Sequence, residues 1–218
     1  TASQMMRRIS CIRAIAGSDV VKSIVDVGSG WEECNLNEHA NNYVDDLCDR
    51  CALIWGYLSA SAKLPERAMV LSWAQIVGAC YQSLLEGFSR VPYSSTEGRA
   101  LMTLDLATFA AGISPRSVVE RLENVVVVNK PPSVQPDCSR QYVDTYIKVF
   151  YYPKDDVLSW ITEHYTDYKM NHALSLIVAA SATNPDESPE RSLPRLMELV
   201  KALYRQDNHT HKTAPAVK

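Results

Sequence analysis

The chain has 218 residues, of which 46% are hydrophobic and 22% charged, and its formal net charge is −3. A chain of this length can bury a substantial core without a metal ion or a disulfide. The absence of a basic excess argues against a nucleic-acid-binding protein. Neither GxxxxGK[ST] nor GxGxxG occurs, so the sequence contains no familiar phosphate-binding loop.

The first segment, residues 5–22, carries three arginines among apolar residues. This pattern is compatible with a transit peptide or a basic helix on a membrane surface, but we favour an amphipathic helix that continues a longer parent chain. No apolar run approaches the roughly 18 residues of a membrane span.

The scattered cysteines are typical of reduced, buried thiols in a cytosolic protein: Cys11, Cys34, Cys48, Cys51, Cys80 and Cys138.

Apolar residues recur at helical spacing through most of the chain. A first stripe consists of Tyr43, Leu47, Cys51, Ile54 and Leu58. A second helix is predicted to begin near Pro65, and its stripe is Met69, Trp73, Ile76, Cys80, Leu84 and Phe88. Gly78 and Gly87 on this helix either weaken it slightly or let a neighbour approach closely.

A third helix is predicted to begin near Ser94, which has capping-box spacing to Glu97. Two adjacent apolar faces imply that this helix packs on two sides: Leu101, Leu104 and Ala111 form one, and Met102, Leu106 and Phe109 form the other.

A further helix is expected after Ser114, with Val118, Leu122 and Val125 facing inward. The four valines 125–128 are the one local strand signal, and a Pro-rich loop follows over residues 129–137.

Helical spacing resumes over residues 142–150 and breaks at Pro153, after which Asp155 is expected to cap the next helix. Two more helices are predicted before and after Asn184-Pro185. The fold class is therefore all-α, with antiparallel bundles of about seven to nine helices. We divide the chain into helical parts 1–128 and 138–206 around the loop and a disordered tail 207–218, with one compact domain as the alternative.

Residues 45–49 (DDLCD) match the DDxxD motif of helical prenyl-diphosphate enzymes, in which carboxylates one turn apart hold magnesium. That chemistry normally requires a second acidic cluster, and Asp155-Asp156 at a helix start is explained by capping. The direction in which Asp45, Asp46 and Asp49 point separates the two interpretations. We favour a solvated helix face and predict neither a metal site nor a catalytic site.

Cys48 and Cys51 form a CxxC pair, but zinc would need two more ligands at matching spacing, and neither a second CxxC nor an HxxxH pair exists. His39, His164 and His172 lie far apart in sequence, and no nucleophile–base pair can be assembled from them. His209 and His211 lie in the expected tail. We therefore predict that the chain is not an enzyme and requires no cofactor.

Aromatic residues gather at Phe150, Tyr151, Tyr152 and Trp160. Large amphipathic rings serve cores and interfaces equally well. We expect Phe150 and Trp160 to lie in the core. Tyr151 and Tyr152 cannot both face inward with Phe150, so at least one of them is expected to face solvent or a partner.

Several segments resemble the C-terminal domain family of syndetin, in order and with similar spacing. Residues 95–105 (STEGRALMTLD) resemble its EGRALM-x-LD segment, residues 142–152 (YVDTYIKVFYY) its ETYIKAYY segment, and residues 160–164 (WITEH) its WIKEH segment. Weaker similarity covers residues 43–45 and 85–88. The resemblance runs from about residue 43 to 177, and residues 1–42, 113–138 and those after 184 depart from it.

This resemblance implies a non-catalytic subunit of the endosome-associated recycling protein complex, which tethers vesicles and returns cargo to the plasma membrane. The fold it implies is that of the C-terminal domains of helical-rod tethering subunits. The implied partners are the other subunits and SNARE or small GTPase proteins on endosomes. The implied location is cytoplasmic and peripheral, on recycling endosomes or the trans-Golgi network. An exocyst- or Golgi-type tethering subunit is the alternative.

The residues singled out within these segments are candidates for either partner contact or internal structure. For Glu97, Arg99 and Asp105 we favour an internal arginine–carboxylate clamp that fixes one helix against another. The remaining candidates are Lys148, Tyr151, Tyr152, Trp160, Glu163 and His164.

Overall fold

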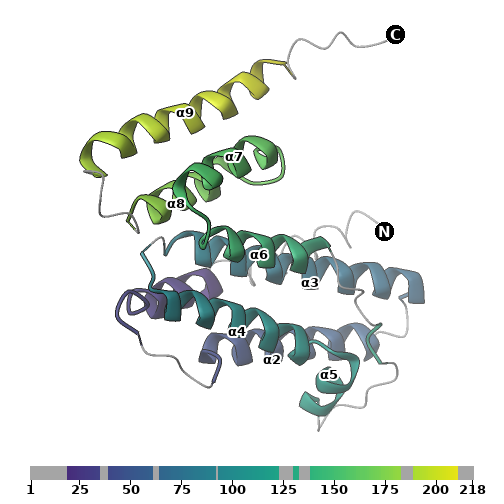
Figure 1. The fold of residues 1–218 in the computed structure, drawn as a ribbon. Coiled ribbons are helices and arrows are strands. Elements are labelled where there is room, and N and C mark those ends of the chain that lie inside the picture. Colours follow the sequence, from purple (N-terminus) through teal and green to yellow (C-terminus); the bar gives the residue numbers. More distant parts are fainter. Residues whose placement is uncertain are drawn as a thin grey trace, which may run out of the picture.

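The computed structural model describes residues 19–34, 39–60, 64–91, 93–122, 130–132, 138–182 and 189–210. Within these ranges all regular structure is helical and no strand occurs, which confirms the predicted all-α class (Figure 1). A helix over residues 19–28 precedes the labelled ones. These are α2 (Asn42–Ala60), α3 (Glu66–Ser89), α4 (Thr96–Gly112), α5 (Pro115–Arg121), α6 (Cys138–Val149), α7 (Lys154–His164), α8 (Met170–Ala182) and α9 (Pro189–Thr210).

The helices form a layered stack (Figure 1). At one end α2, α4 and α5 pack on one another, and α4 also packs on α6. Next to them α3 packs against α2, α6 and α8. At the other end α7 and α9 both pack against α8, so α8 connects the last helices to α3.

The longest helix of this stack, α3, lies at its centre because it is apolar on more than one side. All six residues of its predicted stripe, from Met69 to Phe88, are buried. By length and composition alone α3 is apolar enough to cross a membrane, contrary to the expectation that no apolar run reaches that length. Since most of its apolar stretch is buried inside the protein, α3 has the character of a core helix.

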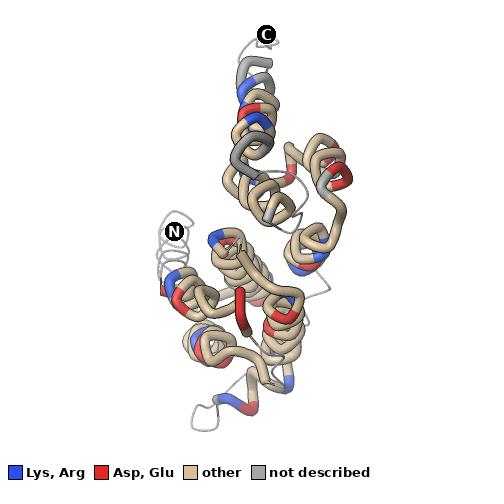
Figure 2. Tube along the Cα trace, turned by 60° about the vertical axis from the view of Figure 1, so that its left-hand side comes forward, with Lys and Arg blue, Asp and Glu red and all other residues tan. Residues whose placement is uncertain are grey.

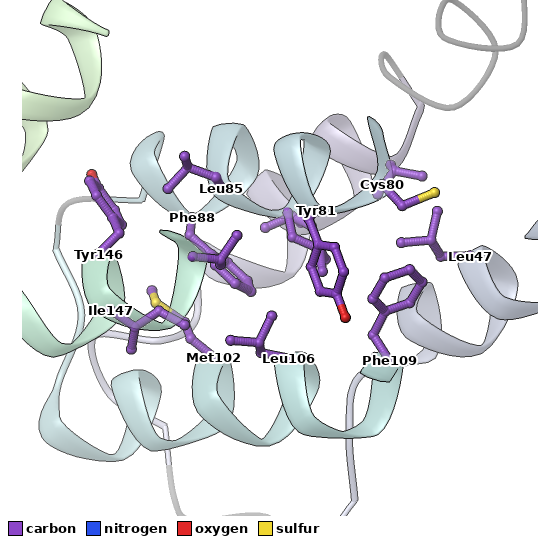
Figure 3. Packing of buried hydrophobic residues seen from close by; sticks show 14 of the residues in the cluster. Leu47, Cys80, Tyr81, Leu85, Phe88, Met102, Leu106, Phe109, Tyr146 and Ile147 are labelled. Carbon is purple, nitrogen blue, oxygen red and sulfur yellow. The ribbon is translucent and has the colours of Figure 1, made fainter. Parts of the chain in front are cut away.

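The side chains between α3 and α4 interdigitate in the centre of the core (Figure 3). Tyr81 and Phe109 meet edge to face with ring centroids 5.1 Å apart, and Phe88 lies near Met102 and Leu106. Each large side chain buried in this way contributes about 1.5–3 kcal/mol to folding. The face of α4 that carries Met102, Leu106 and Phe109 is fully buried, as predicted.

The second predicted face of α4 is only partly covered. Leu101 is buried and Leu104 half-buried, but Ala111 is exposed. The helix nevertheless packs on more than one side, against α2, α5 and α6, as the two faces implied. On α2, the predicted stripe is buried from Tyr43 to Cys51, and it is half-buried at Ile54 and Leu58 toward the end of the helix.

Two predicted helix starts differ from the structure in detail. The N-cap of α4 is Ser95 rather than Ser94, and its hydroxyl accepts a hydrogen bond from the Gly98 backbone N–H. Asp155 does not cap α7, which begins at Lys154 after Pro153. Asp155 instead lies in the first turn, where a carboxylate is favoured by the helix dipole.

The Ile24 side chain lies so close to the backbone at Gly87 that this position of α3 has no room for a larger residue. A Cβ built on Gly87 would lie 2.5–2.8 Å from the buried Ile24 side chain, whereas one on Gly78 would meet nothing closer than 3.6 Å. Gly87 therefore lets the helix of residues 19–28 pack directly on α3. Gly78 has no such neighbour.

The segments on either side of the Pro-rich loop share one hydrophobic cluster, which includes residues of α3, α4, α6 and α8. The valines 125–128 lie outside the described residues, and Lys130–Pro132 has no regular structure. Helix α9 runs to Thr210, past the expected start of the tail at residue 207, and residues 211–218 lie outside the described part.

Candidate functional site

Arg99 lies in the first part of α4 and connects this helix to the end of α6. Its side chain is 5% exposed, and its Nη1 donates a hydrogen bond to the Phe150 carbonyl at 2.7 Å. The guanidinium carbon lies 5.3 Å from the Phe150 ring centroid and 5.7 Å from that of Tyr151. Burial lowers the pKa of Arg99, although an arginine keeps its charge under all ordinary conditions.

Asp105 lies less than two turns further along α4 and holds the start of α2. Its carboxylate is fully buried and accepts hydrogen bonds from the Asn41 backbone N–H and side-chain amide, both at 2.8 Å. The Tyr43 hydroxyl donates a further hydrogen bond to it. Burial raises the pKa of Asp105, and burial and the carboxylate together raise the pKa of Tyr43.

The structure thus places Arg99 and Asp105 in internal contacts, but not in the arginine–carboxylate clamp that we expected. Among the described residues Arg99 bonds a carbonyl rather than a carboxylate, and Asp105 bonds amide and hydroxyl donors. Six positions separate them on α4, so they point to different neighbours. Glu97 is half-buried in the first turn of the same helix.

The turn after α6 places its two tyrosines at the surface. Tyr151 is 48% exposed and Tyr152 is 44% exposed, whereas Phe150 is buried, which agrees with the sequence expectation. Lys148, one turn earlier, forms an ion pair with Asp144 at 2.5 Å and remains largely exposed.

Trp160 of α7 belongs to the core, as expected from its sequence pattern. It is 9% exposed and stacks on the half-buried His164 with ring centroids 4.5 Å apart. The Nδ1 atom of His164 lies 2.9 Å from the Trp160 carbonyl oxygen. Glu163 is exposed.

The DDxxD carboxylates lie on the outer face of α2. Asp45 and Asp49 form ion pairs with Arg121 of α5 at 2.8 and 2.5 Å, and their side chains are 67% and 60% exposed. Asp46 is also exposed. The described residues contain no group of three or more His, Cys, Asp or Glu side chains that could hold a metal ion. The acidic motif therefore ties α5 to α2.

The CxxC thiols are buried in the helix packing rather than presented to a ligand. Cys48 and Cys51 are each 1% exposed, and the Cys51 sulfur lies 3.5 Å from that of Cys80 on α3. Burial raises the pKa of Cys48 to about 12. Since the thiolate is the reactive form of cysteine, this thiol is inert at neutral pH.

A polar cluster that the sequence analysis missed joins α3 to α8. Glu86 Oε2 lies 3.1 Å from His172 Nε2 and 3.3 Å from Lys169 Nζ, and Glu86 also pairs with Arg90 on its own helix. A cavity of about 330 Å³ opens beside it, lined in part by Tyr81, Tyr142 and His172. Glu86 and His172 are 86 positions apart, so no local spacing connects them.

Basic residues (Lys and Arg) and acidic residues (Asp and Glu) are interspersed along the described helices (Figure 2). This distribution agrees with the small net charge of the chain. The polar residues Arg99 and Asp105 therefore make internal contacts, whereas Tyr151 and Tyr152 face outward.

The family model described as "Syndetin, C-terminal" matches residues 3–201. Syndetin of Gallus gallus is 25% identical over 181 residues and syndetin of Mus musculus 24% identical over 181 residues, in each case covering 81% of this chain. The chain spans 17% of the length of these relatives. The matched range extends past both ends of the 43–177 region that the motifs marked. No solved structure matches the chain.

Proposed function

The chain belongs to the syndetin C-terminal family, and from this premise we propose that it is the binding domain of a non-catalytic vesicle-tethering subunit. The subunit acts in the recycling of endosomal cargo to the plasma membrane. Its partners are the other subunits of the tethering complex, together with SNARE or small GTPase proteins on endosomes. It associates with recycling endosomes, or with the trans-Golgi network, peripherally through the complex.

The observation that carries this proposal is the family match over residues 3–201. The geometry supports it, because the polar residues of the matching segments stabilise the helical stack. Arg99 connects α4 to the end of α6, and Asp105 holds the start of α2. A tether works by binding, and such a scaffold presents its outer faces in a defined arrangement.

The other candidates have less support. An exocyst- or Golgi-type tethering subunit would share the helical periodicity but not the ordered segments that match this family. A magnesium-dependent prenyl enzyme would need the DDxxD carboxylates free to face a cavity, whereas Asp45 and Asp49 are paired with Arg121 at the surface.

Affinity capture with the 218-residue chain as bait tests the proposal. Expressed in cells that contain the tethering complex, the chain should recover the other subunits above the level of an unrelated helical bait. A Gly78→Ala variant, which meets no close neighbour, should recover them equally well. Recovery of none of these subunits in several cell types, from a bait shown to be folded, would contradict the proposal.

A further inference from the structure

The guanidinium of Arg99 is a buried charge whose hydrogen bonding is incomplete among the described residues. Among the described residues, its one hydrogen bond goes to the neutral Phe150 carbonyl, and its Nε atom is buried without a partner. The described residues contribute no carboxylate to it. Burying an unpaired charge is costly, and an anion is the partner that compensates it most fully.

The surface above this guanidinium has the residue types that dominate protein interfaces. The exposed Tyr151 ring lies over the guanidinium, and Tyr152 is exposed beside it in sequence. Tyrosine and arginine are enriched among the residues that carry most binding energy. We call Tyr151, Tyr152 and the Arg99 guanidinium beneath the Tyr151 ring the tyrosine–arginine surface.

The local electrostatics favour a negatively charged occupant. Arg99 lies about one turn from the N-terminus of the 17-residue helix α4, where the helix dipole adds a positive partial charge. Lys148 is balanced by Asp144 at 2.5 Å. Glu97 is the opposing group, since its charge acts on the Tyr151 hydroxyl, but it does not bond to Arg99.

We propose that the tyrosine–arginine surface binds an acidic segment of another tethering-complex subunit. A carboxylate of that segment bonds to the Arg99 guanidinium, and its apolar part packs on the two tyrosine rings. Because Arg99 is only 5% exposed, the Tyr151 side chain rotates aside on binding, a common adjustment at interfaces. The inference rests on the proposed function and names the chemistry of one partner.

The first test places a photo-crosslinking benzoylphenylalanine at position 152 of the full-length parent protein in the assembled complex. The matched control carries it at position 57, since Tyr57 is 79% exposed on α2. Position 152 should cross-link to a segment of another subunit that contains Asp or Glu, and position 57 should not reach that segment. Cross-links from position 152 only to lipid, to its own chain or to a segment without carboxylates would overturn the inference.

The second test measures capture of the other subunits by two variants. The double variant Tyr151→Ser/Tyr152→Ser should stay folded with a slightly lowered melting temperature, since both rings are about half exposed and Tyr151 also contacts Arg99, and it should lower the affinity about tenfold. Arg99→Lys keeps the charge but loses the planar fork, and a similar loss is expected. Replacing the partner's cross-linked carboxylate by an amide should lower the affinity of the partner for the wild-type chain. The same replacement should change its affinity for the Arg99→Lys variant little.

The two proposals fail in different ways. If the wild-type chain captures no tethering subunit, the proposed function fails and this inference fails with it. If the wild-type chain and the folded double-tyrosine variant capture the subunits equally, the proposed function stands and only the tyrosine–arginine surface is refuted.

Discussion

At the scale of single residues, the buried carboxylate of Asp105 organises the junction between α2 and α4. It accepts three hydrogen bonds from two residues at the start of α2, and no part of it reaches solvent. Removing a buried carboxylate that accepts several hydrogen bonds costs stability, because each donor is then left without an acceptor.

We predict that Asp105→Ala lowers the free energy of unfolding by about 3 kcal/mol, because the Asn41 and Tyr43 donors are left buried and unpaired. Urea unfolding followed by tryptophan fluorescence measures the change. Asp46→Ala, at an exposed position of α2, serves as the control and should change stability by less than about 0.5 kcal/mol. Equal effects of the two substitutions would show that the Asp105 contacts contribute nothing specific.

The sequence identified Arg99 and Asp105 as clamp residues but not the groups that they bind. The acceptor for Arg99 is 51 positions away, and the Asn41 donor is 64 positions from Asp105. Pairings of this length depend on how helices stack, which hydrophobic spacing does not encode. A carboxylate partner was therefore predicted for Arg99 because it is the most common one, whereas the structure shows a bond to the Phe150 backbone carbonyl.

At the scale of helices, close packing depends on small residues at particular positions. Gly87 allows Ile24 to contact the backbone of α3, whereas Gly78 on the same helix has only ordinary contacts. The two glycines are nine positions apart and have the same intrinsic cost in a helix, so they form a matched pair.

We predict opposite effects of alanine at these two glycines. Gly87→Ala should lower the free energy of unfolding by about 2 kcal/mol, since its Cβ would overlap the Ile24 side chain at 2.5–2.8 Å. Gly78→Ala should raise it by about 0.5–1 kcal/mol through the better helix propensity of alanine. Thermal or urea unfolding of both variants measures this, and a stabilised Gly87→Ala would refute the close approach.

Helix positions were largely predictable because the apolar stripes are strong, as the fully buried stripe of α3 shows. Helix ends were less predictable. Ser94 and Ser95 are both good capping residues, and only the Ser95 backbone and hydroxyl contacts to the Trp31 carbonyl select the second of them. Pro153 set the start of α7 where a capping Asp155 was expected.

At the scale of the whole molecule, Glu86 is one of the polar links between α3 and the layer that contains α8. It bonds His172 and Lys169 from the α8 side and Arg90 on its own helix. Burial alone would raise the pKa of Glu86, but the hydrogen bonds from His172 and Arg90 and the charge of Lys169 lower it to about 2.

We predict that this link weakens in acid. Because the folded-state pKa of Glu86 lies below its ordinary value near 4.5, its stabilising contribution is complete above about pH 5 and is lost as the pH falls toward 2. Burial lowers the pKa of His172, so its protonation below about pH 6.5 also favours the unfolded chain. The wild-type free energy of unfolding should therefore fall between pH 6.5 and 3.

Urea unfolding at a series of pH values checks this prediction. Glu86→Gln should show a shallower decline between pH 5 and 3 than the wild type. Glu120→Gln removes a carboxylate from an exposed pair with Arg116 and should keep the wild-type slope. A Glu86→Gln curve parallel to that of the wild type would show that Glu86 does not stabilise the contact between α3 and α8.

The order of the layers was the part of the fold least accessible to sequence reasoning. Helix α8 is apolar enough to contact α3, α7 and α9, but its composition does not say which neighbour lies on which side. The Glu86–His172 contact depends on that arrangement and was missed for the same reason.

We propose that the outer faces of this helical stack bind the other subunits of a tethering complex. Lysine cross-linking of the assembled complex with its full-length parent protein tests it most directly, since Lys148 and Lys169 have side chains that are 66% and 74% exposed. We expect links from this domain to lysines of other subunits. Links confined to the domain itself, while the rest of the parent protein is linked to its partners, would contradict it.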